Sequence, residues 1–166
     1  MSQHEHKAAG PAAVKVAVLT VSDTRTEATD TSGRAIRMLL EEAGHTVVIA
    51  KIVHDDPDLV TAFVLDRLES DVQVIITTGG TGITSRDSTY EAIDALLEKR
   101  LDGFGELFRM LSYDDIGAAA IMSRACAGLA RGKVVVALPG SEGAVRLAMT
   151  KLIVPELGHL AQQAAK

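Results

Sequence analysis

VQVIITTGGTG, residues 72–82, joins a run of β-branched residues directly to a glycine-rich turn. β-branched residues favour a buried strand, here over Val72–Thr78, and glycines allow the chain to turn sharply where the strand ends. Ser88, with Glu91 three residues later, has the spacing of a capping box and predicts a helix over residues 88–99. The segment therefore predicts a strand, a turn and a helix in succession, which is the unit of a parallel sheet.

The same alternation of strand and helix extends along the chain in both directions. Residues 103–117 form a glycine-punctuated segment to which we assign no element, and Cys126 fits a small apolar strand position. Repeated strand-helix units imply a largely parallel sheet with helices on both faces, a three-layer α/β/α fold. We expect strands at residues 14–22, 46–53, 72–78 and 133–141, and helices at residues 32–44, 56–69, 88–99 and 142–154, the last ending before Pro155.

The length and composition predict one domain with an aliphatic core. A chain of 166 residues can bury roughly two-thirds of the surface that its unfolded form exposes. Aromatic residues are only 3% of the chain, so aliphatic side chains must fill the interior, as in a sheet flanked by helices. Residues 1–13 show no periodicity, and we expect a flexible N-terminal tail there and a single domain over residues 14–166.

The charge and the single cysteine exclude several classes of protein. A net charge of −5 without a cluster of basic residues argues against a nucleic-acid binder. Cys126 has no partner for an intrachain disulfide, and no apolar stretch reaches the roughly 20 residues needed to span a membrane. The first eleven residues lack the apolar core of a signal peptide. We therefore expect a cytoplasmic protein that binds neither nucleic acid nor membrane.

Four polar or glycine-rich motifs follow the predicted strands. In an open α/β sheet, ligands bind beyond the carboxyl ends of the strands, where helix N-termini offer hydrogen-bond donors. If the four strands are parallel, all four motifs lie at one edge of the sheet and predict a ligand site. They are Ser22-Asp23, His54-Asp55-Asp56, Gly79-Gly80-Thr81-Gly82 and Pro139-Gly140-Ser141.

The two glycine-containing motifs suit an anionic ligand. Glycines at 79, 80 and 82 let backbone N–H groups approach phosphate oxygens, although a tight strand-to-helix turn would need the same glycines. Ser141 can bind a phosphate or simply cap the following helix. The loop is neither a P-loop nor a GxGxxG fingerprint, which argues against two common nucleotide-binding folds.

The acidic residues at the same edge imply a cation. A carboxylate about 6 Å from a phosphate charge repels it by roughly 3 kcal/mol at an effective dielectric near 20. Mg²⁺ held by one or two carboxylates and the phosphates would remove that repulsion, and Arg86 offers a second positive charge. Singly, each acid also fits a solvated or helix-capping role. The acids in question are Asp23, Asp55, Asp56 and Asp87.

Five motifs occur along the chain in a specific order and spacing. They are TTGGTG (Thr77–Gly82), SRD (Ser85–Asp87), GFGELFRMLS (Gly103–Ser112), SRACAG (Ser123–Gly128) and LPGS (Leu138–Ser141). On this highly specific combination, the chain from about Val14 to Leu160 resembles the MoaB/MogA family of molybdenum cofactor biosynthesis proteins. The resemblance implies a three-layer fold with a mixed sheet, and the MogA branch transfers AMP from Mg-ATP to the terminal phosphate of molybdopterin, with release of pyrophosphate.

Carried over to this sequence, the resemblance assigns Asp55 and Asp87 as catalytic residues that hold Mg²⁺ through ATP. It implies that Gly79–Gly82 and Ser141 line the ligand crevice and that Glu106 lies near the same pocket. Our hypothesis is that the glycine loop and the PGS turn hold phosphates for in-line attack, without a nucleophilic side chain. The resemblance also implies a homotrimer or a hexamer, and contacts with other proteins of the pathway.

Two other functions compete with adenylyl transfer. The segment GFGELFRMLSYDDIG (Gly103–Gly117) is more similar to MoaB than to MogA, which leaves a non-catalytic molybdopterin-binding or scaffold protein as the main alternative. A redox or dinucleotide-binding protein is the third hypothesis, and the missing GxGxxG fingerprint argues against it.

Overall fold

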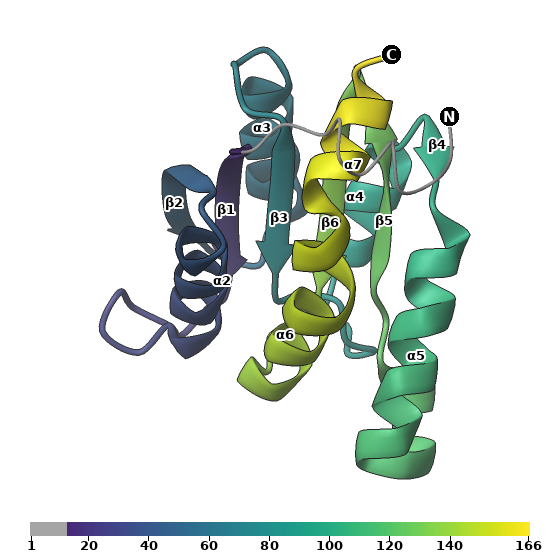
Figure 1. The fold of residues 1–166 in the computed structure, drawn as a ribbon. Helices are drawn as coiled ribbons and strands as arrows, with labels where there is room; N and C mark the ends of the chain where they lie inside the picture. The colour runs from purple at the N-terminus through teal and green to yellow at the C-terminus, as the bar shows by residue number, and fades with distance from the viewer. Residues whose placement is uncertain (1–12) are drawn as a thin grey trace.

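The computed structural model describes residues 13–166 and contains a six-stranded sheet in the order β2-β1-β3-β6-β5-β4, shown in Figure 1. Most of the predicted N-terminal tail, residues 1–12, lies outside the described residues. The strands are β1 (Lys15–Val21), β2 (Thr46–Val53), β3 (Val74–Thr78), β4 (Lys99–Arg100), β5 (Cys126–Ala130) and β6 (Lys133–Leu138). The helices are α2 (Thr31–Glu42), α3 (Pro57–Leu68), α4 (Thr89–Leu96), α5 (Asp102–Ile116), α6 (Glu142–Ala148) and α7 (Val154–Ala164).

Strands β1, β2, β3 and β6 are parallel, whereas β5 runs antiparallel to both β6 and β4. The predicted three-layer α/β/α fold with a mostly parallel, mixed sheet is therefore confirmed. The four parallel strands end at the same edge, because Val21 pairs with Val53, and Thr78 pairs with both Thr20 and Leu138. The arrowheads of β1 and β3 mark this edge in Figure 1. The four motifs that follow these strands consequently gather at one edge of the sheet, as the sequence predicted.

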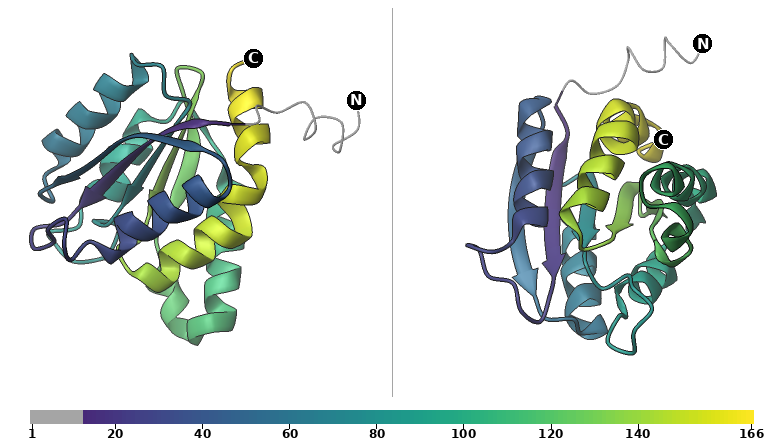
Figure 2. Two further views of the ribbon diagram at one scale, coloured as in Figure 1. Left: turned by 60° about the vertical axis from the view of Figure 1, so that its left-hand side comes forward. Right: turned by 90° about the horizontal axis from the view of Figure 1, so that it is seen from below.

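Helices cover both faces of the sheet (Figures 1 and 2). One face packs against α2, α5, α6 and α7, and the opposite face packs against α3 and α4. Alternate strand residues therefore enter different core clusters, as Val18 and Leu19 do in β1. Because both clusters exclude water, the central strands are buried along almost their whole length and show no alternation of buried and exposed residues.

Helix α4 differs from its prediction at both ends. It ends at Leu96 instead of residue 99, because Leu97 is extended and the next residues enter the edge strand β4. The predicted capping box is wrong: the Ser88 hydroxyl makes no cap hydrogen bond and donates instead to Asp55. The Glu91 carboxylate accepts a hydrogen bond from Arg124. Both side chains therefore bind residues from other parts of the chain and do not cap α4.

The unassigned segment at residues 103–117 is mostly one helix, α5, of 15 residues. Glycines weaken the helical signal by about 1 kcal/mol each, and there are two in its first turn. Phe108, fully buried in the core beside the sheet, shows that tertiary packing stabilises the helix. Gly117 ends α5 with a positive φ of 67°.

The C-terminal helix does not end before Pro155 as expected. Helix α6 continues through a π-helical turn, η2 (Met149–Ile153), into α7. Pro155 lies in the first turn of α7, where a missing N–H is tolerated, and the wide turn before it accommodates the ring. Neither this segment nor any other helix within residues 13–166 is both long and apolar enough to cross a membrane.

Candidate functional site

A cavity of about 820 Å³ opens at the carboxyl edge of the parallel strands. It combines the predicted glycine loop, the PGS turn and two of the predicted acids with residues from α5, the 3₁₀ turn η1 (Gly117–Met122) and α6. Its lining is Val21, Arg25, Asp55, Gly79–Gly82, Asp87, Ser112, Asp115, Ile116, Ala119, Met122, Ser123, Pro139–Ser141, Gly143, Ala144 and Leu147.

The glycine loop adopts a conformation that side chains would obstruct. Gly79 and Gly80 have φ values of +97° and +71°, in the left-handed region that favours glycine. A Cβ on Gly79 would lie 2.1 Å from the Val21 carbonyl oxygen, and one on Gly82 would lie 2.5 Å from Asp87 Oδ2. The glycines therefore allow the loop to pack directly against β1 and against the Asp87 carboxylate.

The loop presents unpaired backbone donors. Within residues 13–166, the N–H groups of Gly80, Thr81, Gly82 and Ile83 donate no hydrogen bond. Gly79 differs, because its N–H donates to the Leu138 carbonyl at 3.0 Å and so ties the loop to β6. Consecutive free N–H groups in a glycine turn form a typical anion-binding nest.

The PGS turn lies directly against the glycine loop. Thr78 Oγ1 donates to the Pro139 carbonyl at 2.8 Å, and a Cβ on Gly140 would lie 3.3 Å from the Gly79 Cα. Ser141 Oγ accepts a hydrogen bond from the Ala144 N–H at 3.3 Å, so its capping role is present in the structure. The turn thus supports the loop and places Ser141 at the rim of the cavity.

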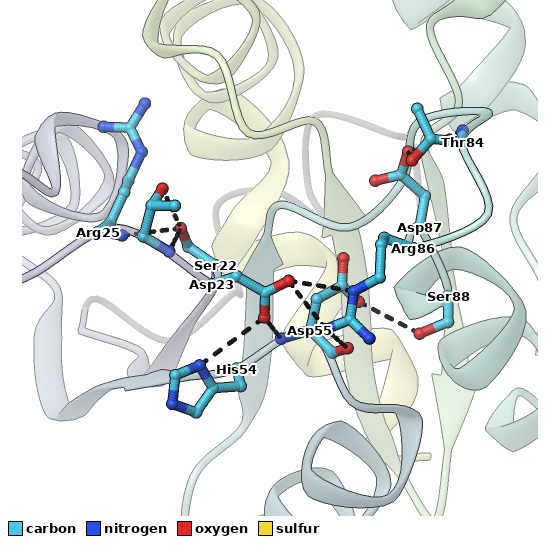
Figure 3. Close-up of polar contacts among 10 residues, drawn as sticks. Ser22, Asp23, Arg25, His54, Asp55, Thr84, Arg86, Asp87 and Ser88 are labelled. Carbon is cyan, nitrogen blue, oxygen red and sulfur yellow. Dashed lines mark hydrogen bonds and ion pairs between the residues drawn. The ribbon is translucent and has the colours of Figure 1, made fainter.

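Asp23 and Arg86 form an ion pair beside the cavity (Figure 3). Arg86 Nη2 donates to Asp23 Oδ2 at 2.8 Å and to the Asp55 carbonyl oxygen at 3.1 Å. The Asp55 N–H donates to the other carboxylate oxygen of Asp23 at 3.0 Å. Arg86 and these hydrogen bonds lower the pKa of Asp23 below its ordinary value. Asp23 and Arg86 do not line the cavity, and their contacts hold the turn that carries Asp55.

Asp55 is a buried acid at the cavity wall, with 8% of its surface exposed. Burial raises the pKa of Asp55, and the neighbouring charges of Asp87 and Asp23 raise it further, whereas a hydrogen bond from Ser88 lowers it. The ionised carboxylate is therefore costly in this position, and a nearby cation would stabilise it.

Asp87 closes the turn that follows the glycine loop. Its Oδ2 accepts hydrogen bonds from the Thr84 N–H at 3.0 Å and from Thr84 Oγ1 at 2.7 Å. These contacts orient the carboxylate toward Gly82 and leave Oδ1 free of any hydrogen bond within residues 13–166. Asp55 and Asp87 both line the cavity, and each lies against a different glycine of the loop: a Cβ on Gly80 would lie 3.2 Å from Asp55 Oδ1, and one on Gly82 would lie 2.5 Å from Asp87 Oδ2. Figure 3 shows the two carboxylates with their hydrogen-bond partners.

Besides Asp23 and Arg86, two more residues expected at the site lie outside the cavity lining. Glu106 is exposed on α5 and is absent from the cavity lining, so the structure does not place it in this pocket. Helix α5 contributes Ser112, Asp115 and Ile116 instead, which lie two to three turns farther along. Ser22 also lies outside the lining, and its Oγ accepts hydrogen bonds from the backbone N–H groups of residues 24 and 25.

Arg25 and the end of α5 were missed in the sequence. The long segment between β1 and α2 shows no periodicity that would place Arg25 in the cavity, where its Nη1 donates to the Thr29 carbonyl at 2.9 Å. A helix at residues 102–116 would have predicted that Ser112, Asp115 and Ile116 share a face. The spacing of these three residues predicts a shared face only once the helix itself is assigned, and Arg25 could be placed only by the structure.

The acidic residues fit a cation that arrives with phosphates better than a resident metal. Within the part of the chain that the structure describes, no group of three His, Cys, Asp or Glu side chains is arranged to hold a metal ion. Mg²⁺ commonly uses one or two carboxylates and takes its remaining ligands from phosphates and water. Asp55 and Asp87, separated by a loop with free N–H groups, fit that second arrangement.

Comparisons with known proteins agree with this fold. A family described as "Probable molybdopterin binding domain" matches residues 17–159. Molybdenum cofactor biosynthesis protein B of Bacillus anthracis is 56% identical over 162 residues, covering 96% of each chain. A crystal structure of a molybdenum cofactor biosynthesis protein B has a TM-score of 0.88 and 54% identity, covering 91% of this chain and 95% of that one. The crystal structure of the tungsten cofactor synthesizing protein MoaB from Pyrococcus furiosus has a TM-score of 0.84 and 41% identity, covering 94% of this chain and 99% of that one. The chain therefore belongs to the MoaB/MogA family of molybdenum cofactor biosynthesis proteins.

Proposed function

We propose that the protein binds molybdopterin and transfers AMP to its terminal phosphate from Mg-ATP. The observation that carries the proposal is the row of free backbone N–H groups from Gly80 to Ile83, flanked by the carboxylates of Asp55 and Asp87. Free N–H groups bind phosphate oxygens, and the paired acids suit a phosphate-bound cation. The family match and the relatives named as molybdenum cofactor biosynthesis proteins support the choice of substrate.

In the proposed reaction, an oxygen of the molybdopterin phosphate attacks the α-phosphorus of ATP. A new P–O bond forms, the bond to the β-phosphate oxygen breaks, and pyrophosphate leaves. The chain needs no nucleophile for this chemistry, because phosphoryl-group transfer depends mainly on positioning and charge stabilisation. The free N–H groups of the glycine loop would hold phosphate oxygens, and Arg25 adds a positive charge to the cavity lining.

Asp55 and Asp87 are the residues that would hold Mg²⁺ through ATP. When bound, the metal neutralises phosphate charge and allows two acids to face a polyphosphate. Asp55 is suited to this role because burial disfavours its ionised form in the folded chain, as its raised pKa indicates. Arg86 stabilises the turn that carries Asp55 through its bond to the Asp55 carbonyl.

The apolar part of the cavity suits a flat ring. Ile116, Ala119 and Met122 come from α5 and η1, and Leu147 comes from α6, so the cavity has both a polar phosphate end and apolar walls. A pterin or an adenine ring would remove this apolar surface from water. The combination fits a phosphorylated heterocycle better than a simple anion.

A single-turnover assay with purified protein, Mg-ATP and molybdopterin tests the proposal. We expect release of pyrophosphate together with formation of adenylylated molybdopterin. Tight binding of molybdopterin without turnover would contradict the catalytic proposal and favour the non-catalytic binding or scaffold protein. If neither turnover nor molybdopterin binding is seen, both forms of the proposal are wrong.

We also propose that the protein is a homotrimer or a hexamer in the cytoplasm and contacts other proteins of the pathway. An exposed apolar surface on α5 and η1 supports self-association. It comprises Leu107, Met110, Tyr113, Ile116, Ile121 and Met122. Sedimentation equilibrium should give three or six times the 17.5 kDa mass of one chain. A monomer at micromolar concentration would contradict this part of the proposal.

A further inference from the structure

The carbonyl groups of the glycine loop are held by a residue outside the cavity. Arg124 precedes β5 and does not line the cavity. Its Nε donates to the Thr81 carbonyl oxygen at 2.9 Å, and its Nη2 donates to the Gly82 carbonyl oxygen at 3.0 Å. One guanidinium therefore binds two successive carbonyl groups of the loop.

These two hydrogen bonds also determine the direction of two N–H groups. In a planar trans peptide, the carbonyl and the N–H point in opposite directions, and no described peptide is cis. The Thr81 carbonyl shares its peptide with the Gly82 N–H, and the Gly82 carbonyl shares its peptide with the Ile83 N–H. Holding both carbonyls on Arg124 therefore directs the Gly82 and Ile83 N–H groups away from it. Both belong to the row of free donors described above.

Arg124 is itself held in place on two further sides. Its Nη1 donates to Glu91 Oε1 at 2.6 Å, and its guanidinium carbon lies 4.6 Å from the centre of the Tyr90 ring. Glu91 and Tyr90 both belong to the first turn of α4, the helix that follows the loop. The planar, five-donor guanidinium can make all these contacts at once, which an ammonium group cannot. The loop, α4 and the start of β5 are thereby joined at one side chain.

We propose that Arg124 is a positioning residue for phosphate: it fixes the peptides of residues 81–83 so that their N–H groups stay aimed at the ligand. The inference rests on the proposed function for its ligand, whereas the ordering of the loop is a property of the chain alone. Arg124 acts through the backbone and makes no contact with the substrate. Local sequence does not reveal this role, because Arg124 lies 42 residues away from Gly82 along the chain.

Amide NMR on the full-length protein tests the inference in two stages. In the ligand-free protein, we expect Arg124→Gln to lower the heteronuclear NOE of the Gly82 and Ile83 amides. On titration with inorganic pyrophosphate as the probe, we expect the same amides to shift in the wild type, with about tenfold weaker binding in Arg124→Gln, because charge-assisted hydrogen bonds to the loop are lost. Arg124→Lys should recover part of the affinity.

Glu91→Gln is the matched control. It removes the ion pair on Arg124 but leaves both bonds to the loop carbonyls, so loop order and pyrophosphate affinity should stay within about twofold of the wild type. If the substitutions acted only by lowering overall stability, Arg124→Gln and Glu91→Gln would both have a lower melting temperature. The heteronuclear NOE values of the Gly82 and Ile83 amides would then not differ between the two variants. In the transfer assay, Arg124→Gln should lower the rate, whereas Glu91→Gln should not.

Wild-type loop order and pyrophosphate affinity in Arg124→Gln would overturn the inference. If the wild-type amides do not respond to pyrophosphate or molybdopterin, the proposed function is wrong. A fall in loop order in Arg124→Gln, but not in Glu91→Gln, would then still support the positioning role. The two failures are therefore distinguishable.

Discussion

Asp23 accepts a hydrogen bond from the backbone N–H of Asp55 at 3.0 Å, while the other oxygen of Asp23 pairs with Arg86. Asp23 thus supports the turn that carries Asp55 and also adds negative charge near it. Because the Asp23 charge contributes to the raised pKa of Asp55, Asp23→Asn should lower the pKa of Asp55 toward its ordinary value. Carboxyl ¹³C titration by NMR measures this change, and an unchanged or higher Asp55 pKa in the variant would contradict the assignment.

Asp55→Asn should stabilise the ligand-free fold at neutral pH. The pKa of Asp55 is raised from 3.8 mainly by burial, so the folded protein binds this proton more tightly than the unfolded chain does. Protonated Asp55 therefore favours folding, and that contribution is lost as pH rises through the folded pKa. Asparagine carries no charge, so its advantage should be present at pH 7 and should shrink toward pH 3.8 and below.

Urea unfolding of the wild type and of Asp55→Asn across this pH range measures the effect. A variant that is less stable than the wild type at pH 7, with the gap closing at low pH, would show that the carboxylate is compensated in the folded chain. Such a result would remove the argument that Asp55 is poised for a cation.

Gly79→Ala should destabilise the fold and Gly103→Ala should not. Gly79 has a φ of +97° and no room for a Cβ, so alanine there should cost about 1–3 kcal/mol or more. Gly103 lies in α5 with nothing near its missing Cβ, so alanine there should be neutral or stabilise by up to about 1 kcal/mol. Chemical denaturation of both variants checks the contrast, and equal effects would mean that the loop conformation is not held as described.

Cys126 should be unreactive toward thiol reagents in the folded protein. Burial raises the pKa of its thiol to about 12, so at pH 8.5 the thiolate that reacts is scarce. We expect Cys126 to react with Ellman's reagent at least about tenfold more slowly in the folded protein than in the urea-unfolded protein. Equally rapid reaction in both states would show that the start of β5 opens readily.

The four parallel strands, and the sheet edge at which the motifs gather, could be predicted from the sequence because their signals are local. The largely apolar run at residues 72–78, followed by a glycine-rich turn, forms a buried parallel strand as its sequence predicts. Asp56 also caps α3 as its sequence predicts. Strand direction then brings the turns to one edge without any detail of side-chain packing.

What the sequence missed depends on tertiary partners. Ser88 and Glu91 have the spacing of a capping box, but Asp55 and Arg124 compete successfully for them. The two glycines in α5 weaken the signal of a helix that core packing stabilises. Glu106 on this helix is exposed, and residues near the end of α5 line the pocket instead. None of these outcomes follows from local propensity.

The most direct test of the account is pyrophosphate release from Mg-ATP and molybdopterin by folded Asp55→Asn and Asp87→Asn proteins, with Glu106→Gln as the matched control. Glu106 is an exposed acid outside the cavity. We predict a loss of about a hundredfold or more in each aspartate variant and a wild-type rate in the control. Wild-type release by both aspartate variants would contradict the central claim that these carboxylates act on the phosphates of the substrate.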